Sequence, residues 1–170
     1  MLHLRRALPT DIASIAAIEA EPPVVGDVYS VELLKLMVPS TFCAVENGTV
    51  IGFITAHRLT PSVLKREKKG FKYNSRVPKK GMRLKDVLKV VNIKVRVSHQ
   101  NKGIGKTMVR FALNASGAHR VVEYETPFSG THVIATCLSA QEYVMLPNTQ
   151  KKRAYDCGAK THSFCFERVI

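Results

Sequence analysis

The stretch from Val95 to Val109, V-R-V-S-H-Q-N-K-G-I-G-K-T-M-V, joins an apolar strand to a helix through a glycine-containing loop. A run rich in β-branched residues starts at Val87, and apolar residues after the loop recur at helical spacing to about Ser116. The first turn of a helix offers unpaired N–H groups and the positive end of its dipole. We therefore expect the loop to hold an anion such as a phosphate. Gly103 and Gly105 would let the backbone approach that anion, because neither residue has a Cβ.

Two other phosphate-binding motifs fit this loop less well, and a turn that binds nothing is the remaining interpretation. A P-loop has four residues between its first glycine and a Gly-Lys-Ser/Thr triplet. Gly105, Lys106 and Thr107 supply that triplet, but Gln100 stands where the first glycine belongs. A dinucleotide-binding loop needs a third glycine where the chain has Met108.

The spacing Gln100-x-x-Gly103-x-Gly105 resembles the pyrophosphate loop of the GNAT superfamily of acetyl-CoA-dependent N-acetyltransferases. Near the C-terminus, Arg153–Gly158 resembles a second segment of that family that carries a tyrosine, here Tyr155. The resemblance implies an α/β fold in a single domain over residues 1–170. Its sheet would be mixed and mostly antiparallel, with a splayed parallel pair of central strands and helices on both faces.

The expected elements follow that order along the chain. We expect a strand over His3–Leu8, a helix capped by Thr10-Asp11, a helix over Ser30–Val38, a hairpin of Thr41–Glu46 and Thr49–His57 turning at Asn47-Gly48, a helix around Gln150–Cys157 and a closing strand over Thr161–Val169. Residues 60–85 read as a long basic insertion. The strand parallel to the central one is placed at His132–Leu138, with a start at Val121 as the alternative.

The resemblance also implies how the chain would hold acetyl-CoA, with no metal. The backbone N–H groups that would surround the pyrophosphate are those of Gln100, Asn101, Lys102, Gly103, Ile104, Gly105, Lys106 and Thr107. Ile93, Lys94 and Val95 would lie beside the pantetheine arm as a substitute strand neighbour. The Val95 N–H would face the thioester carbonyl, where negative charge develops during transfer. The expected reaction is direct transfer of the acetyl group to a primary amine, of a small molecule or of a protein, in a ternary complex.

Tyr155 is the candidate general acid, because a phenol can give a proton to the departing thiolate and the matching family position does so. Packing of a half-buried tyrosine is the alternative interpretation, and Tyr143 is the reserve candidate.

The general base stays open at this stage. Glu19, Glu21, Asp86 and a water chain are all candidates. His99 and His132 have suitable intrinsic pKa values, although a lone histidine is more often a surface or packing residue.

The acceptor amine is expected at the loop Pro22–Tyr29. Acidic residues there, Glu19, Glu21 and Asp27, would attract a cationic amine or a basic peptide, or they are a solvated helix end.

The net charge of +13 is local: residues 65–106 hold 15 Lys or Arg and two acidic residues. Such a segment steers an anionic ligand, docks on an acidic partner such as RNA or a ribosome, or is a solvated loop. It supports an alternative function, an inactive GNAT-like module that binds an acidic partner through these residues. Too few aromatic residues lie in it for a base-stacking platform, although phosphate contacts need none.

No apolar run is long enough to cross a bilayer and the first residues lack a secretory pattern, so we expect a cytoplasmic protein with access to the nucleus left open. The four cysteines have no C-x-x-C spacing, which is typical of free thiols in a reducing compartment. Cys157, His162 and Cys165 could ligate zinc, but a strand with alternating faces fits them better.

Overall fold

The computed structural model of the chain describes residues 1–22, 28–58, 87–116, 121–127, 143–145, 151–154 and 160–168. The basic insertion expected at 60–85, the strand expected at 132–138 and the candidates Asp27, Asp86, His132 and Tyr155 lie outside the described residues.

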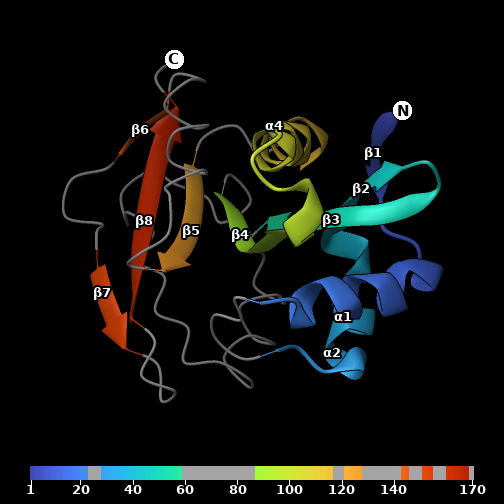
Figure 1. The fold of residues 1–170 in the computed structure, drawn as a ribbon. Helices are drawn as coiled ribbons and strands as arrows, with labels where there is room; N and C mark the ends of the chain where they lie inside the picture. Colours follow the sequence, from blue (N-terminus) through green and yellow to red (C-terminus); the bar gives the residue numbers. More distant parts are fainter. Residues whose placement is uncertain are drawn as a thin grey trace.

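One mixed sheet contains all strands of the described ranges (Figure 1). They are β1 (Leu2–Arg6), β2 (Thr41–Glu46), β3 (Thr49–Arg58), β4 (Val87–Val95), β5 (Val121–Pro127), β6 (Tyr143–Met145), β7 (Lys151–Ala154) and β8 (Lys160–Arg168). The order is β1-β2-β3-β4-β5-β8-β6, with β7 also paired to β8. Only β4 and β5 pair in parallel, over Val87–Val90 and Val121–Tyr124. The mostly antiparallel mixed sheet expected from the sequence is therefore confirmed.

Helices cover both faces of the sheet, as expected. Helices α1 (Ile12–Ala20) and α2 (Val31–Met37) lie on one face, and α4 (Ile104–Ser116) lies on the other (Figure 1). Successive strand residues point to opposite faces, so β2 and β3 contribute to two cores. Cys43 and Phe53 pack with Ile15 and Ile18 of α1, whereas Phe42 and Ile54 belong to the core around α4.

The hairpin of β2 and β3 has the turn that the sequence predicts. Asn47 and Gly48 both have positive φ angles, 50° and 79°. Two consecutive residues in this region are what a type I′ turn requires, and its twist matches that of the flanking strands. The hairpin places β3 beside the central strand β4.

The start of α1 differs in detail from the expected cap at Thr10-Asp11. A 3-10 turn, η1 (Pro9–Asp11), precedes the helix, and Asp11 makes no side-chain bond to the helix N-terminus. Its carboxylate instead accepts hydrogen bonds from the Leu8 N–H and from the Arg5 guanidinium. Asp11 therefore ties β1 to the first helix.

The structure corrects two expectations in the C-terminal half. The parallel partner of β4 begins at Val121, which was the alternative start rather than the preferred one. The helix expected around Gln150–Cys157 is wrong at Lys151–Ala154, which form β7 and pair antiparallel with β8. This segment is too short and too polar to form an apolar helical stripe, so cross-strand backbone bonds determine its conformation instead. The closing strand is confirmed as β8.

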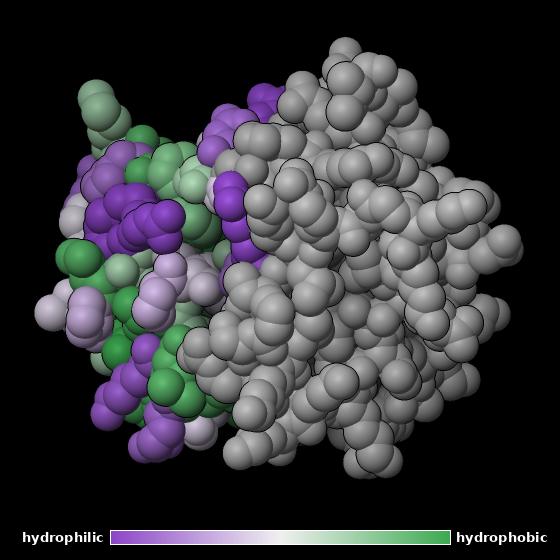
Figure 2. Space-filling view, turned by 180° about the vertical axis from the view of Figure 1, so that it is seen from behind, coloured by the Kyte–Doolittle hydropathy of each residue, from purple (hydrophilic) through white to green (hydrophobic). Residues whose placement is uncertain are grey.

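The surface of the described part mixes residue types. Figure 2 shows hydrophobic and hydrophilic residues interspersed on the face opposite that of Figure 1. Exposed apolar side chains such as Leu8, Leu36 and Val97 are of the kind that ordinary monomer surfaces carry singly. Among the helices of the described ranges, none is both long and apolar enough to span a membrane.

Candidate active site at the end of the central strand

The C-terminal half of β4 presents alternate side chains to the two faces of the sheet. Ile93 and Val95 pack toward the core that contains α4. Asn92, Lys94 and Arg96 all reach the C-terminal end of α1 on the opposite face. Three polar residues at alternate positions within an apolar run thus hold the end of α1 against the central strand.

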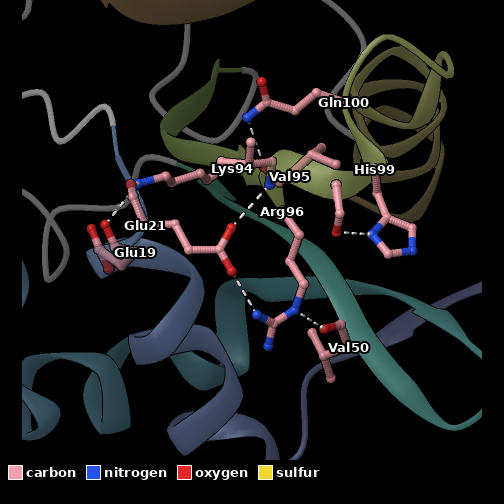
Figure 3. A network of polar contacts seen from close by, with 10 residues as sticks. Glu19, Glu21, Val50, Lys94, Val95, Arg96, His99 and Gln100 are labelled. Atoms are coloured by element: carbon pink, nitrogen blue, oxygen red, sulfur yellow. Dashed lines mark hydrogen bonds and ion pairs between the residues drawn. The ribbon is translucent and has the colours of Figure 1, made fainter.

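Arg96 and Glu21 form the centre of this network (Figure 3). Arg96 Nη1 donates to Glu21 Oε1 at 2.6 Å, and Arg96 Nε donates to the Val50 carbonyl oxygen at 3.0 Å. The other carboxylate oxygen of Glu21 accepts a hydrogen bond from the Val97 N–H at 3.0 Å. Both oxygens of Glu21 therefore have partners, and these partners fix the end of α1 to the residues that follow β4.

Lys94 caps the end of the same helix. Its Nζ donates to the Glu19 carbonyl oxygen at 2.7 Å and also to the Glu21 carbonyl oxygen. Carbonyl groups in the last turn of a helix have no intrahelical partner, and a cation there is favourable. Burial lowers the pKa of Lys94, while Glu19 and Glu21 oppose that shift.

Glu19 is the buried carboxyl group of this site. Only 6% of the residue is exposed, and its Oε1 accepts a hydrogen bond from Asn92 Nδ2 at 2.8 Å. Its Oε2 is buried and has no hydrogen-bond partner among the described residues. Burial raises the pKa of Glu19, against the opposing effects of the Asn92 amide, the Lys94 charge and a backbone hydrogen bond with Tyr29.

Within the described ranges, no strand pairs with one backbone edge of β4 beyond Val90, although the Val95 carbonyl oxygen on that edge accepts a hydrogen bond from the Gln100 side chain. The ladder to β5 ends at Val90, whereas the ladder to β3 continues to Val95. The Arg96 N–H donates to the Ile51 carbonyl oxygen, so alternate residues Ile93 and Val95 direct their backbone groups away from β3. A strand-like ligand could hydrogen-bond to those groups.

The loop after β4 turns the chain into α4. A 3-10 turn, η4 (Val97–His99), is followed by Gln100, whose Nε2 donates to the Val95 carbonyl oxygen at 3.0 Å. Asn101 and Gly103 have positive φ angles of 62° and 77°. The Gly103 carbonyl oxygen accepts from both the N–H and the hydroxyl of Thr107, which marks the start of the helix.

The geometry of the loop fits an anionic group such as a pyrophosphate. A Cβ built at Gly103 would have no heavy atom within 4 Å, so the space beside it is open. The residues of the first turn, Ile104 and Gly105, lie where a helix offers unpaired N–H groups. The positively charged residues Lys102 and Lys106 lie on either side of Gly103, Ile104 and Gly105.

The predicted site residues fall into three groups. Ile93–Val95 and Gln100–Thr107 are brought together as one strand end, loop and helix start. Lys94 differs from its neighbours, because its backbone faces β3 and its side chain binds α1. Tyr143 lies in β6, far along the sheet order from β4.

The other acid-base candidates in the described ranges have partners. His99 lies 3.3 Å from Glu46 in an ion-pair geometry and 2.8 Å from the Ser98 hydroxyl. His162 and Cys165 lie in a strand, β8, which agrees with the strand interpretation of this segment. No group of potential metal ligands is found within the part of the chain that the structure describes.

Sequence reasoning missed Asn92 and Arg96. The signal was present, since Asn92, Lys94 and Arg96 interrupt the apolar run with a period of two. That pattern indicates one polar face on a strand, but it does not say what covers the face.

Comparison with known proteins places this geometry in a family. The model of the acetyltransferase (GNAT) family matches residues 17–135, which is more than half of the chain. The chain therefore belongs to the GNAT acetyltransferase family and is an acyltransferase that uses acetyl-CoA. Comparison with curated protein sequences gives no match.

Solved structures share the fold. The chain is similar to the diaminobutyrate acetyltransferase EctA from Paenibacillus lautus, solved with L-2,4-diaminobutyric acid and coenzyme A, with a TM-score of 0.69 and 16% identity over 96% of this chain and 94% of that one. Ard1 from Thermoplasma volcanium has a TM-score of 0.65 and 18% sequence identity over 99% of each chain. The ribosomal-protein-alanine N-acetyltransferase from Brucella melitensis has a TM-score of 0.66 and 13% sequence identity over 99% of each chain. At these identities the likeness establishes the fold.

Proposed function

We propose that this protein transfers the acetyl group of acetyl-CoA directly to a primary amine of a small molecule or a protein, in a ternary complex. The observation that carries the proposal is the backbone edge of β4 at Ile93 and Val95, which leads directly into the anion loop before α4. A single ligand with an amide-containing arm and a pyrophosphate matches both halves of that surface.

The donor side is assigned to the backbone. The N–H groups from Gln100 to Thr107 would hold the pyrophosphate, and the outward groups of Ile93 and Val95 would bind the pantetheine arm. The Val95 N–H would stabilise negative charge at the reacting carbonyl. When bound, acetyl-CoA supplies the activated acetyl group. Tyr155 stays the proposed proton donor to the leaving thiolate.

The acceptor side is assigned to the end of α1 and the residues around Tyr29. Known relatives of this fold act on different amines: the Paenibacillus protein binds diaminobutyric acid, and the Brucella protein is a ribosomal-protein-alanine acetyltransferase. These two support one free amine and one peptide N-terminus as first acceptors to test.

The test is release of free CoA thiol in the presence of acetyl-CoA and either L-2,4-diaminobutyrate or a peptide with an N-terminal alanine, with the acetylated product identified by mass spectrometry. We expect amine-dependent thiol release with at least one acceptor from a panel that contains these two compounds and other small-molecule amines and peptide N-termini. Binding of acetyl-CoA is measured separately by calorimetry. No acetyl-CoA binding by the folded protein would overturn the proposal.

Two variants that each introduce one negative charge into α4 make the test specific for the loop. Gly105→Glu places a carboxylate in the first turn of α4, where it would repel a pyrophosphate while remaining compatible with the helix dipole. Asn114→Glu adds the same charge at an exposed position near the other end of the helix. We expect acetyl-CoA binding to be lost only in Gly105→Glu. Equal binding by both variants would show that the ligand lies elsewhere.

A further inference from the structure

We propose that Glu19 is the catalytic base for the acceptor, with its buried Oε2 binding the incoming ammonium group and accepting its proton. This inference rests on the proposed function and adds to it a residue that the sequence leaves undecided among several.

The structure separates Glu19 from the other acidic residues of the described ranges. Both oxygens of Glu21 are engaged, by Arg96 and by the Val97 N–H. Both oxygens of Asp11 are held by Arg5, and one also by the Leu8 N–H. Glu19 Oε2 is the buried side-chain atom that lacks a partner within these ranges.

The orientation of the carboxyl group is fixed from one side. Asn92 Nδ2 donates to Oε1 at 2.8 Å, the Tyr29 backbone also hydrogen-bonds to the carboxyl group, and Oε2 has no partner among the described residues. A buried polar atom without a partner costs about 1–3 kcal/mol, so folded proteins rarely keep one without a function. An ammonium N–H donor would satisfy Oε2.

The position agrees with the donor site. Asn92 directly precedes Ile93, whose backbone begins the edge where the pantetheine arm is proposed to bind. The Glu19 carboxyl group therefore lies on the α1 face of β4, beside the pantetheine segment Ile93–Val95 and three residues before Val95, whose N–H is proposed to face the thioester carbonyl. An amine held there would approach that segment from the face opposite α4.

The electrostatic surroundings make Glu19 a stronger base than an exposed carboxylate. Burial raises the pKa of Glu19, and the charged group facing it is Lys94, with the backbone of Tyr29 and the neutral amide of Asn92 as its other neighbours. A carboxylate with a raised pKa is a stronger proton acceptor than an exposed one.

The proton transfer balances as follows. One N–H bond of the ammonium breaks, its proton forms an O–H bond at Oε2, and the electron pair stays on nitrogen. That pair forms the C–N bond to the thioester carbonyl carbon as the C–S bond breaks. Tyr155 gives its proton to the departing thiolate, and the second surplus proton of nitrogen returns to the Tyr155 phenolate. Glu19 then releases its proton to water, so the net products are the amide, CoA and one proton.

The test uses Glu19→Gln with the full chain and the acceptor identified by the thiol-release assay. Glutamine keeps the shape of the side chain and an oxygen for Asn92, but it cannot accept a proton. We expect kcat to fall by about 10²–10⁴-fold, the usual contribution of a positioned base. Glu32→Gln, at an exposed position of α2, is the matched control and should keep full activity.

Two further readouts separate a base from a structural residue. The wild type should lose kcat/KM as pH falls through the pKa of Glu19, and the residual activity of Glu19→Gln should lack that limb. Acetyl-CoA affinity should stay within about twofold in the variant. Glu19→Asp keeps the carboxylate but moves it away from the amine, because the side chain is one methylene shorter. Its kcat should lie between those of the wild type and Glu19→Gln, and it replaces Glu19→Gln in the test if that variant does not fold.

The outcomes are distinct. If Glu19→Gln binds acetyl-CoA and turns over within twofold of the wild type with the same pH profile, the inference is overturned and the proposed function stands. If the wild type acetylates no amine although it binds acetyl-CoA, the proposed function fails and the inference falls with it. A large loss in kcat with the pH limb removed supports both.

Discussion

The Gln100 side-chain amide donates a hydrogen bond to the Val95 carbonyl oxygen at 3.0 Å, which joins the anion loop to the last residue of β4. Val95 is also a residue whose backbone points away from β3. The two proposed halves of the donor site, the strand edge and the loop, are thus held together by one side chain.

Replacing Gln100 should weaken donor binding more than it weakens the fold. Gln100→Ala removes a hydrogen bond worth about 1 kcal/mol, and we expect acetyl-CoA affinity to fall roughly five- to tenfold because the loop loses its register on the strand. Calorimetric titration measures the change. Ser98→Ala, which alters an exposed neighbour bonded to His99, is the control. A similar loss in both variants would contradict a specific role for Gln100.

The positive φ of Gly103 offers a second test. Gly103→Ala forces alanine into a left-handed conformation, at a cost of about 1 kcal/mol of stability. Gly48 in the hairpin has nearly the same φ and equally open surroundings, so Gly48→Ala is a matched control for backbone strain. Chemical denaturation should show similar losses for the two variants. Acetyl-CoA binding should fall only in Gly103→Ala, and an equal effect on binding would place the ligand away from the loop.

The ion pair between Arg96 and Glu21 should hold the end of α1, on the proposed acceptor side, against the residues that follow β4, on the proposed donor side. Arg96→Ala leaves the Glu21 carboxylate with only the Val97 N–H as a described partner, and we expect a loss of about 1–3 kcal/mol in the free energy of unfolding. The KM for the amine should rise more than the KM for acetyl-CoA, because the end of α1 is released. A double-mutant cycle with Glu21→Gln measures the coupling energy. Additive effects would show that the pair is not coupled.

Sequence reasoning reaches as far as local patterns determine the structure. The Asn47-Gly48 turn and the glycine of the anion loop could be predicted because each position needs a conformation that few residues adopt. The contact between Glu19 and Asn92 joins residues 73 positions apart, and no local pattern encodes which acidic residue is left with an unpaired oxygen. At Lys151–Ala154 the conformation follows from pairing with β8, a partner that composition does not reveal.

Glu19 and Asp11 should affect stability in opposite directions as pH changes. Burial raises the pKa of Glu19 above its ordinary value of 4.5, so its contribution is fully present below that pH and is lost as pH rises through the folded-state pKa. The Arg5 hydrogen bond lowers the pKa of Asp11 below its ordinary value of 3.8, so its contribution is present above that pH and is lost as pH falls. Thermal melting across pH 3 to 8, the range over which carboxyl groups titrate, measures both effects. Glu19→Gln should reduce the fall in melting temperature at pH values above the ordinary Glu pKa. Asp11→Asn should reduce the fall in melting temperature at acidic pH. Parallel curves for Glu19→Gln and the wild type would show that the carboxyl group titrates normally.

The Cys43 thiol should be inert in the folded protein. Cys43 is fully buried in β2 beside α1, and burial raises its pKa to about 12. Because the thiolate is the reactive form, alkylation by iodoacetamide at pH 8 should label Cys43 only after unfolding. Peptide mapping of native and denatured samples by mass spectrometry identifies the labelled cysteine directly. In Glu32→Gln the protection should be unchanged, whereas Ile18→Ala, which opens a cavity in the same core and costs about 2–5 kcal/mol, should accelerate labelling. Rapid labelling of Cys43 in the native wild type would contradict its placement between the sheet and α1.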